Sequence, residues 1–248
     1  MSEINLFKKI KDNSKRFLTP KMLLRYAPGH MREETSTTRL NHSNVFTLDR
    51  LNTNKNFETG LSATLGFDYE LQESSKKLDF SIAQIINEKE NKDMPSSSSL
   101  DQRFSDVVGH SQLEMNDNIK LSYNFAVDQN YEQLNYNELG VNLDFNPIKF
   151  DINYLQEKEH VGDQEYFKGK INFAPNEYAL FSAETKRNLI TNSAEYYNLS
   201  YEYTNDCLRA GLVYRREFYN DSELEPEDSL MFKITLTPFG NINSPSFN

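Results

Sequence analysis

The sequence predicts an all-β fold, with antiparallel strands arranged as a transmembrane β-barrel. Three observations predict it: alternation of apolar and polar residues, the length of the alternating segments, and the order of short and long connections. The stretch "NIKLSYNFAVD" (118–128) shows the alternation, because residues from Ile119 to Val127 are apolar at every second position. Such a period of two is typical of a strand with one apolar and one polar face.

About twelve strands follow one another along the chain. The first is "KMLLRYAP" near the start, and from Phe57 onward alternating segments run nearly end to end. The phase of one segment, "EYALFSAETK" (177–186), is ambiguous. The predicted strands cover residues 21–28, 57–72, 76–87, 107–115, 118–128, 136–145, 148–156, 165–173, 177–186, 193–203, 207–218 and 229–237.

Strand length and connection order favour a membrane barrel over a soluble all-β protein, which is the alternative. A tilted barrel strand needs roughly 9–11 residues to cross a bilayer, whereas soluble strands average about five or six. Outer-membrane barrels alternate short turns on one side with longer loops on the other. The same alternation occurs here, with short connections at 73–75, 116–118, 146–147, 174–176 and 205–206 and longer ones at 88–106, 128–133, 157–164, 187–192 and 219–229.

Composition excludes several classes of function. The 248 residues carry a net charge of −10, which argues against a nucleic-acid partner because phosphate binding requires basic surface. No catalytic motif is present, and we expect neither enzymatic activity nor a cofactor. The first 21 residues lack the apolar core of a secretory signal. The histidines are scattered singly without metal-ligand spacing, at His30, His42, His110 and His160.

Five stretches carry a resemblance to a known family. These are "LLRYAPGHMR" (23–32), "NVFTLDRL" (44–51), "FETGLSATLGFDYEL" (57–71), "LSYEYTNDCLRAGLVYRREF" (199–218) and "FKITLTPFGNI" (232–242). They resemble the C-terminal barrel region of the LptD family of lipopolysaccharide-assembly proteins, also called organic solvent tolerance proteins. The resemblance implies a non-catalytic protein that inserts lipopolysaccharide into the outer leaflet of the outer membrane of a Gram-negative bacterium. It further implies lipopolysaccharide, the plug lipoprotein LptE, the periplasmic Lpt bridge and outer-membrane lipid as partners.

The expected division of the chain follows from this resemblance. Residues 1–21 form a polar lead-in, residues 22–240 form the barrel strands, and residues 241–248 form a tail. We expect the chain to be the C-terminal part of a larger barrel, with the signal peptide and the N-terminal domain that reaches the Lpt bridge outside it. A general porin or passive diffusion barrel is the alternative function, and an outer-membrane phospholipase or protease is a second rival.

The resemblance and the strand pattern also yield candidate site residues. Cys207 matches the late cysteines of the family, which implies a disulfide to the N-terminal region; an idle thiol is the alternative. The turn signal Pro28-Gly29 predicts that the first strand ends in a long loop, and the family-motif loop comprises Arg25, Tyr26, Pro28 and Gly29.

Basic side chains of the predicted lumen could contact the phosphates of lipopolysaccharide. The alternative is that they are paired with acidic neighbours such as Asp144 and Asp151 and have no ligand. The candidates are Lys120, Lys149, Lys168, Lys170 and Arg209.

Overall fold

The computed structural model describes residues 2–3, 6–10, 14–35, 39–51, 56–158, 163–218 and 227–236. Over these residues the structure is all-β apart from a single 3-10 turn, Ser96–Ser98, and twelve of the strands have nine residues or more. This confirms the predicted fold class and number of strands. The strands are β1 (Ser2–Glu3), β2 (Leu6–Ile10), β3 (Ser14–Ala27), β4 (Gly60–Gln72), β5 (Lys76–Asn87), β6 (Val107–Met115), β7 (Ile119–Val127), β8 (Leu134–Phe145), β9 (Ile148–Glu157), β10 (Gln164–Asn176), β11 (Ala179–Asn188), β12 (Ser193–Thr204), β13 (Leu208–Glu217) and β14 (Glu227–Leu236).

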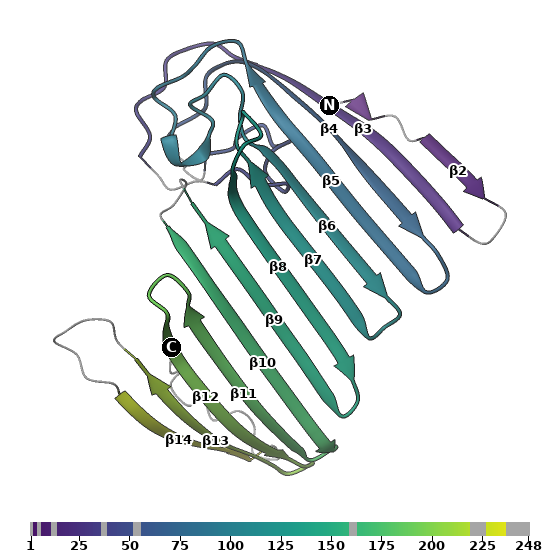
Figure 1. Cartoon of the computed structure of the whole chain (residues 1–248), viewed down its shortest axis with the longest axis vertical. Helices are drawn as coiled ribbons and strands as arrows, with labels where there is room; N and C mark the ends of the chain where they lie inside the picture. Colours follow the sequence, from purple (N-terminus) through teal and green to yellow (C-terminus); the bar gives the residue numbers. More distant parts are fainter. Residues whose placement is uncertain are drawn as a thin grey trace. The chain divides into compact units, whose positions relative to one another are not determined.

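The strands are hydrogen-bonded in chain order within one sheet (Figure 1). The order runs β1-β3-β4 and then consecutively to β14, with β2 also paired to β3. Among the described residues this order does not close on itself, so the arrangement is barrel-like but open. Within the described ranges, no helix has the length and apolar composition needed to cross a membrane.

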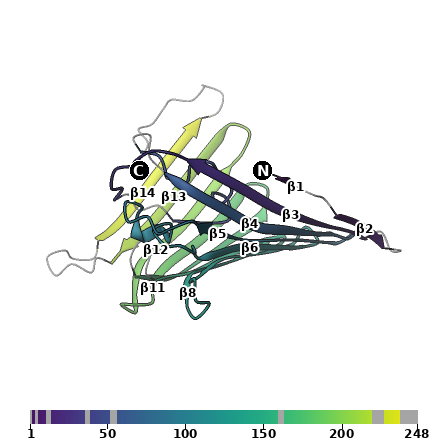
Figure 2. The ribbon, with the colours of Figure 1, turned by 90° about the horizontal axis from the view of Figure 1, so that it is seen from above.

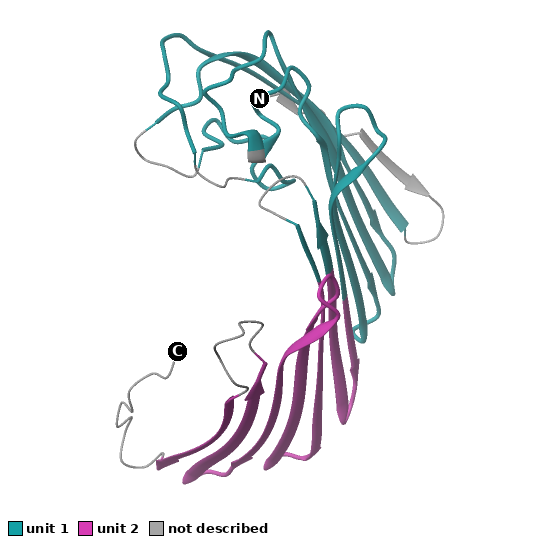
Figure 3. Ribbon diagram, turned by 60° about the vertical axis from the view of Figure 1, so that its left-hand side comes forward, with its two compact units in different colours: residues 1–140, 155–165 teal, residues 141–154, 166–248 magenta. Residues whose placement is uncertain are grey.

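Two compact units divide the chain, and Figure 3 colours them separately. Unit 1 comprises residues 1–140 and 155–165, and unit 2 comprises residues 141–154 and 166–248. The predicted division at residues 21/22 and 240/241 stays a prediction, although β3 begins at Ser14 and therefore crosses the first of these boundaries.

In unit 1, apolar and polar residues are sorted to opposite faces of the sheet. The strands β3–β6 form a single layer, which Figure 2 shows from above. Met22 pairs with Leu65, and Leu65 pairs with Gln84, so these residues lie on one face. That face, called the apolar face, leaves large apolar side chains exposed; Leu24 is 64% exposed. Gln84, a polar residue on this face, donates to the Ser105 carbonyl oxygen at 2.9 Å.

The opposite face of unit 1, called the polar face, is covered at one end of the strands by two long connections. Residues 28–59 join β3 to β4, residues 88–106 join β5 to β6, and both gather at the same end of the strands (Figure 3). A small apolar core lies between them and the sheet, because Ile85 and Val108 from the strands and Val45 and Leu100 from the connections are at most 2% exposed. Ile85 lies on the polar face of β5 but contributes to this core, which explains why an apolar residue occurs among polar ones.

Unit 2 repeats the same sorting without such a cover. Phe173 pairs with Phe181, Phe181 with Tyr201, and Tyr201 with Leu212, which aligns one apolar row across four strands. The row continues to Phe232 on β14, which is 67% exposed. This register resolves the ambiguous segment 177–186: Phe181 and Ala183 lie on the apolar face, and Ser182 and Glu184 lie on the polar face.

The connections confirm the predicted alternation. Short turns at 73–75, 116–118, 146–147, 177–178 and 205–207 join alternate strand pairs. Longer connections at 28–59, 88–106, 128–133 and 158–163 join the others, and the connection at 189–192 is the shortest of these. The connection between β13 and β14 lies mostly outside the described residues. Within each unit, the long connections between described strands therefore leave at one end of the strands, and the short turns leave at the other.

Candidate functional site

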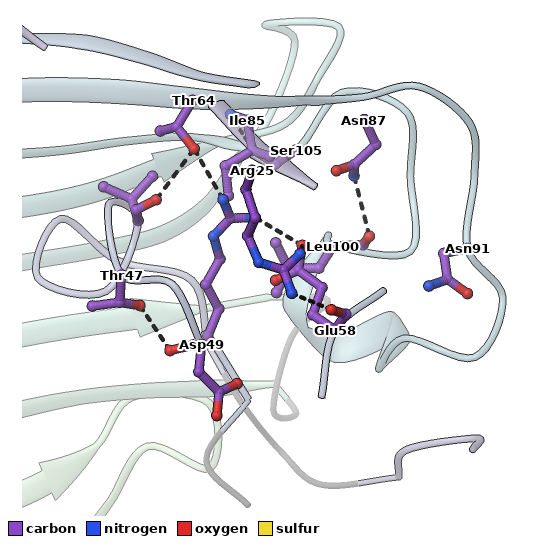
Figure 4. Close-up of polar contacts among 12 residues, drawn as sticks. Arg25, Thr47, Asp49, Glu58, Thr64, Ile85, Asn87, Asn91, Leu100 and Ser105 are labelled. Carbon is purple, nitrogen blue, oxygen red and sulfur yellow. Dashed lines mark hydrogen bonds and ion pairs between the residues drawn. The ribbon is translucent and has the colours of Figure 1, made fainter. Parts of the chain in front are cut away.

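A buried ion cluster fixes the connection 28–59 to the polar face of unit 1 (Figure 4). Arg25 comes from β3, whereas Arg50 and Glu58 come from the connection itself. One carboxylate oxygen of Glu58 lies 2.9 Å from Arg50 Nη1 and 3.2 Å from Arg25 Nη1. Arg50 Nη2 also donates to Thr64 Oγ1 at 3.0 Å, and Arg25 Nε donates to the Leu48 carbonyl oxygen at 2.8 Å.

The cluster is enclosed, and its charges are therefore strongly coupled. Arg25, Arg50 and Glu58 are 8%, 2% and 4% exposed. Burial raises the pKa of the Glu58 carboxyl, and the nearby Arg50 and Arg25 guanidinium groups lower it in part. Burial likewise lowers the pKa of the Arg50 guanidinium, and Glu58 offsets part of this change. Two guanidinium groups thus depend on one carboxylate for compensation.

The family-motif residues are divided between the two faces by the strand geometry. Arg25 points into the cluster, while its neighbour Tyr26 lies on the apolar face and is 71% exposed. Strand β3 ends at Ala27, directly before Pro28-Gly29, as the turn signal predicts. Gly29 has φ = +130°, a conformation that side chains with a Cβ rarely adopt. The assignment of Arg25, Tyr26, Pro28 and Gly29 to a family-motif loop stays a prediction.

A cavity of about 310 Å³ lies between residues 42–46 of the connection and the polar face. His42 and His110 stack beside it, with ring centroids 4.4 Å apart, and Lys21 forms an ion pair with Asp68. Burial lowers the pKa of His42, the positive charge of His110 lowers it further, and Asp68 raises it in part. The sequence showed only isolated histidines, because these two are separated by 68 positions. The described residues contain no group of acidic, histidine or cysteine side chains able to hold a metal ion.

The five basic candidates lie on the polar faces beside carboxylates. Lys120, in unit 1, forms an ion pair with Glu114 at 3.3 Å. In unit 2, Lys149 pairs with Asp144, Lys168 with Glu184 at 3.0 Å, and Arg209 with Glu202 at 2.9 Å. Lys170 lies across the β10–β11 ladder from Glu184, so Lys168 and Lys170 are brought together. Contact with a phosphate would have to compete with these carboxylates, and it stays a prediction.

Cys207 lies in the short turn 205–207 and is exposed. Its backbone N–H donates to Asn205 Oδ1 at 3.0 Å, which is typical of a tight turn closed by an asparagine. The thiol is thus accessible at the end of the strands that carries the short turns. The disulfide implied for it stays a prediction.

Long antiparallel strands in chain order, with one exposed apolar face and one polar face rich in charge, define a β-barrel-like protein. The match to known families then gives a more specific assignment. The chain belongs to the LptD family, because the family model described as LPS transport system D matches residues 5–176. It therefore belongs to proteins of lipopolysaccharide transport. A comparison with curated proteins found no match.

The matched residues differ in extent from the resemblance inferred from sequence. The match begins before Leu23 and includes the whole of β3 to β10, and it ends before β11. Four of the five basic candidates lie inside it, whereas Arg209 and Cys207 lie outside. The family membership is confirmed, and the late strands contribute nothing to this match.

We expect Glu58→Gln to release the connection 28–59 from the sheet. Removing one partner of a buried ion pair leaves the other charge uncompensated and costs about 3–5 kcal/mol. Proteolysis of the folded protein within residues 28–59 should therefore become faster. Glu33→Gln is the matched control, because Glu33 is an exposed carboxylate in the same connection. Equal cleavage rates for the two variants would contradict the stabilising role of the cluster.

We also expect acid to loosen residues 39–51. The pKa of His42 is lower in the folded state than in the unfolded state. Neutral His42 therefore contributes fully to folded-state stability above about pH 6.5, and this contribution is lost as the pH falls through the lower folded-state pKa. Amide hydrogen exchange in residues 39–51, corrected for intrinsic rates, should then accelerate between about pH 7.5 and about pH 5. His42→Phe keeps the ring contact and removes the titration, so the acceleration should diminish.

His30→Phe provides the control for this measurement. His30 is exposed in the same connection, and its replacement should leave the acceleration unchanged. The groups facing His42 are His110, Lys21 and Asp68, and all three are retained in both variants. An unchanged pH response in His42→Phe would assign the effect to another group.

Proposed function

We propose that the chain forms part of the wall of an outer-membrane barrel that delivers lipopolysaccharide to the outer leaflet. Membership of the LptD family supports lipopolysaccharide as the transported substrate. The observation that carries the proposal is the sorting of side chains in both units. Lipopolysaccharide joins acyl chains to phosphorylated sugars, and a wall with one apolar and one charged face offers a separate environment to each.

The apolar face is suited to contact with hydrocarbon. Leu24, Leu230 and Phe232 are 64%, 70% and 67% exposed, and they belong to continuous stripes. A contiguous apolar surface of this extent is rare on a soluble protein. Charged residues in phase with the stripes include Arg16, Arg187 and Arg216, and they lie near the ends of β3, β11 and β13, where a long side chain can reach the membrane surface.

The polar face is suited to a hydrated interior through which the sugars and phosphates pass. Its charges are paired across neighbouring strands, as in Lys168–Glu184 and Arg209–Glu202. Such pairs hold both signs of charge in place without a net basic surface. A phosphate passing along this face can replace one carboxylate at a time beside its basic partner. Such stepwise replacement favours transfer over tight binding.

The partners of the proposed function follow the family. The long connections face the cell exterior, and the short turns, with Cys207, face the periplasm. The plug lipoprotein LptE would lie against the polar face, and the Lpt bridge would reach the barrel through an N-terminal domain. The reaction is physical transfer, with no covalent step.

Adjacent cysteine substitutions test which face meets lipid. In a Cys207→Ser background, we expect Leu121→Cys and Leu199→Cys to react with a lipid-soluble maleimide. Ser122→Cys and Ser200→Cys should react with a water-soluble maleimide, because neighbouring residues of a strand point to opposite faces. The opposite pattern of labelling would mean that the charged face meets lipid, and the proposal would fail.

A photoreactive residue at Asn172, on the polar face of β10, tests lipopolysaccharide passage. In cells that make lipopolysaccharide, we expect irradiation to yield a covalent adduct with it. Lys170→Gln should reduce the yield by about tenfold or more, because a hydrogen bond to a charged group contributes about 1.5–3 kcal/mol. Lys77→Gln is the control, since Lys77 is paired with Asp79 on β5 in unit 1. Sugar permeation without any adduct would favour a passive diffusion barrel.

A further inference from the structure

An apolar groove of about 400 Å³ crosses strands β10–β13 on the apolar face of unit 2. Ile171 and Phe173 of β10 line it, together with residues of the three following strands. Its lining is apolar apart from Ser182, Ser200 and two tyrosines. The remaining lining residues are Phe181, Ala183, Leu199, Ser200, Tyr201, Leu212 and Tyr214.

The groove results from small side chains between larger ones. Ala183 pairs with Ile171 on one side and Leu199 on the other, so a single methyl group lies in the middle of that row. The next row towards the short turns is aromatic. Phe181 lies 4.7 Å from Tyr201 and 6.2 Å from Phe173, measured between ring centroids, and these rings form one wall of the groove.

Two arginines lie above the groove on the same face, towards the long connections. Arg216 pairs with Tyr197, one row above Leu199, and Arg187 lies one row higher on β11. Both are exposed. Arg187 donates to Asn192 Oδ1 at 2.6 Å and to its carbonyl oxygen at 3.3 Å.

Arg216 is held less tightly than Arg187. Its Nε lies 3.7 Å from Asp228 Oδ1, and its guanidinium lies 5.1 Å from the Phe218 ring centroid. A separation of 3.7 Å is too long for a hydrogen bond, so the pair with Asp228 is loose. The Arg216 guanidinium can therefore turn towards an external anion, and the exposed Arg187 can bind one through the N–H groups that do not contact Asn192.

The spacing of arginines and aromatic wall matches one leaflet of a membrane. Six residues separate Arg187 from Phe181, which is about 20 Å along a strand. With a strand tilt of roughly 35–45°, this becomes about 15 Å along the membrane normal. That is half of the hydrocarbon thickness of about 30 Å. An acyl chain whose phosphate meets the arginines would thus end near the aromatic wall.

We propose that the groove and the arginines Arg187 and Arg216 form a binding site for the lipid A part of lipopolysaccharide on the outer surface of the barrel wall. The inference rests on the proposed function, which places the long connections outside and this face in lipid. Lipid A carries several acyl chains and two phosphates. The arginines lie on β11 and β13, two strand spacings or about 10 Å apart across the sheet. Phosphatidylethanolamine has one phosphate and an amine that these cations repel.

Photocrosslinking in vesicles of defined composition tests the site. The full chain carries a photoreactive residue at Leu199, and the vesicles contain phosphatidylethanolamine with a minor fraction of lipopolysaccharide. We expect adducts enriched in lipopolysaccharide relative to its share of the vesicle lipid. The same residue placed at Leu65 is the matched control, because Leu65 is 46% exposed on the apolar face of unit 1.

Arginine variants test the contribution of the phosphates. Arg187→Gln combined with Arg216→Gln should reduce the lipopolysaccharide adduct at Leu199 by at least about tenfold, since charge-assisted hydrogen bonds are lost. Arg187→Lys combined with Arg216→Lys keeps the positive charge and should retain most of the lipopolysaccharide adduct. The phosphatidylethanolamine adduct should not fall in either variant.

Each other outcome overturns the proposal in a recognisable way. Adducts at Leu199 and Leu65 that both follow the bulk lipid ratio mean that the face meets lipid but has no specific site. An adduct with a second copy of the chain means that the groove is a protein interface. Absence of any lipid adduct at both positions means that the apolar face does not meet lipid, and the proposed function fails together with the site.

Discussion

Every β-strand presents backbone N–H and C=O groups that must find hydrogen-bond partners, and this constraint shapes the sheet in both units. Consecutive antiparallel pairing satisfies the backbone from β3 to β14. Because side chains alternate along each strand, the same pairing forces them into rows across the sheet. A shift of one residue in any ladder would exchange apolar and charged rows. The rows through Leu65 and through Tyr201 show that the register is kept in both units.

The charged residues of the polar face are neutralised in different ways in the two units. In unit 2 its charges are satisfied between neighbouring strands and remain partly exposed, as at Lys168 and Glu184. Exposed pairs of this kind contribute little to stability. In unit 1 the connection 28–59 covers the face, and Arg25, Arg50 and Glu58 are removed from solvent. There the same types of residue hold the connection to the sheet.

Much of the fold could be predicted from the sequence because alternation is a local signal. The strand from Ile119 to Val127 and the row through Phe181 both depend on residues two positions apart. The segment 177–186 stayed ambiguous because apolar residues occur in both of its phases, and only its pairing with β10 and β12 assigns them.

The candidate site was less predictable because it joins residues far apart in the chain. Arg25 is singled out by its motif, but Arg50 lies in a stretch without periodicity and Glu58 lies at the edge of a predicted strand. The contact of His42 with His110 likewise depends on how the connection folds back. No spacing rule relates such positions, so no sequence pattern predicts the cavity between them.

The connection 28–59, which covers part of the polar face of unit 1, also limits which molecules can move along that face. Under the proposed function, a bulky glycan that advanced over the strands of unit 1 towards the long connections would meet residues 39–51, which are held by Arg25 and Glu58. Dislodging them would expose three buried charges and a set of packed aliphatic side chains. The segment would therefore act as a fixed barrier that directs large polar molecules around it.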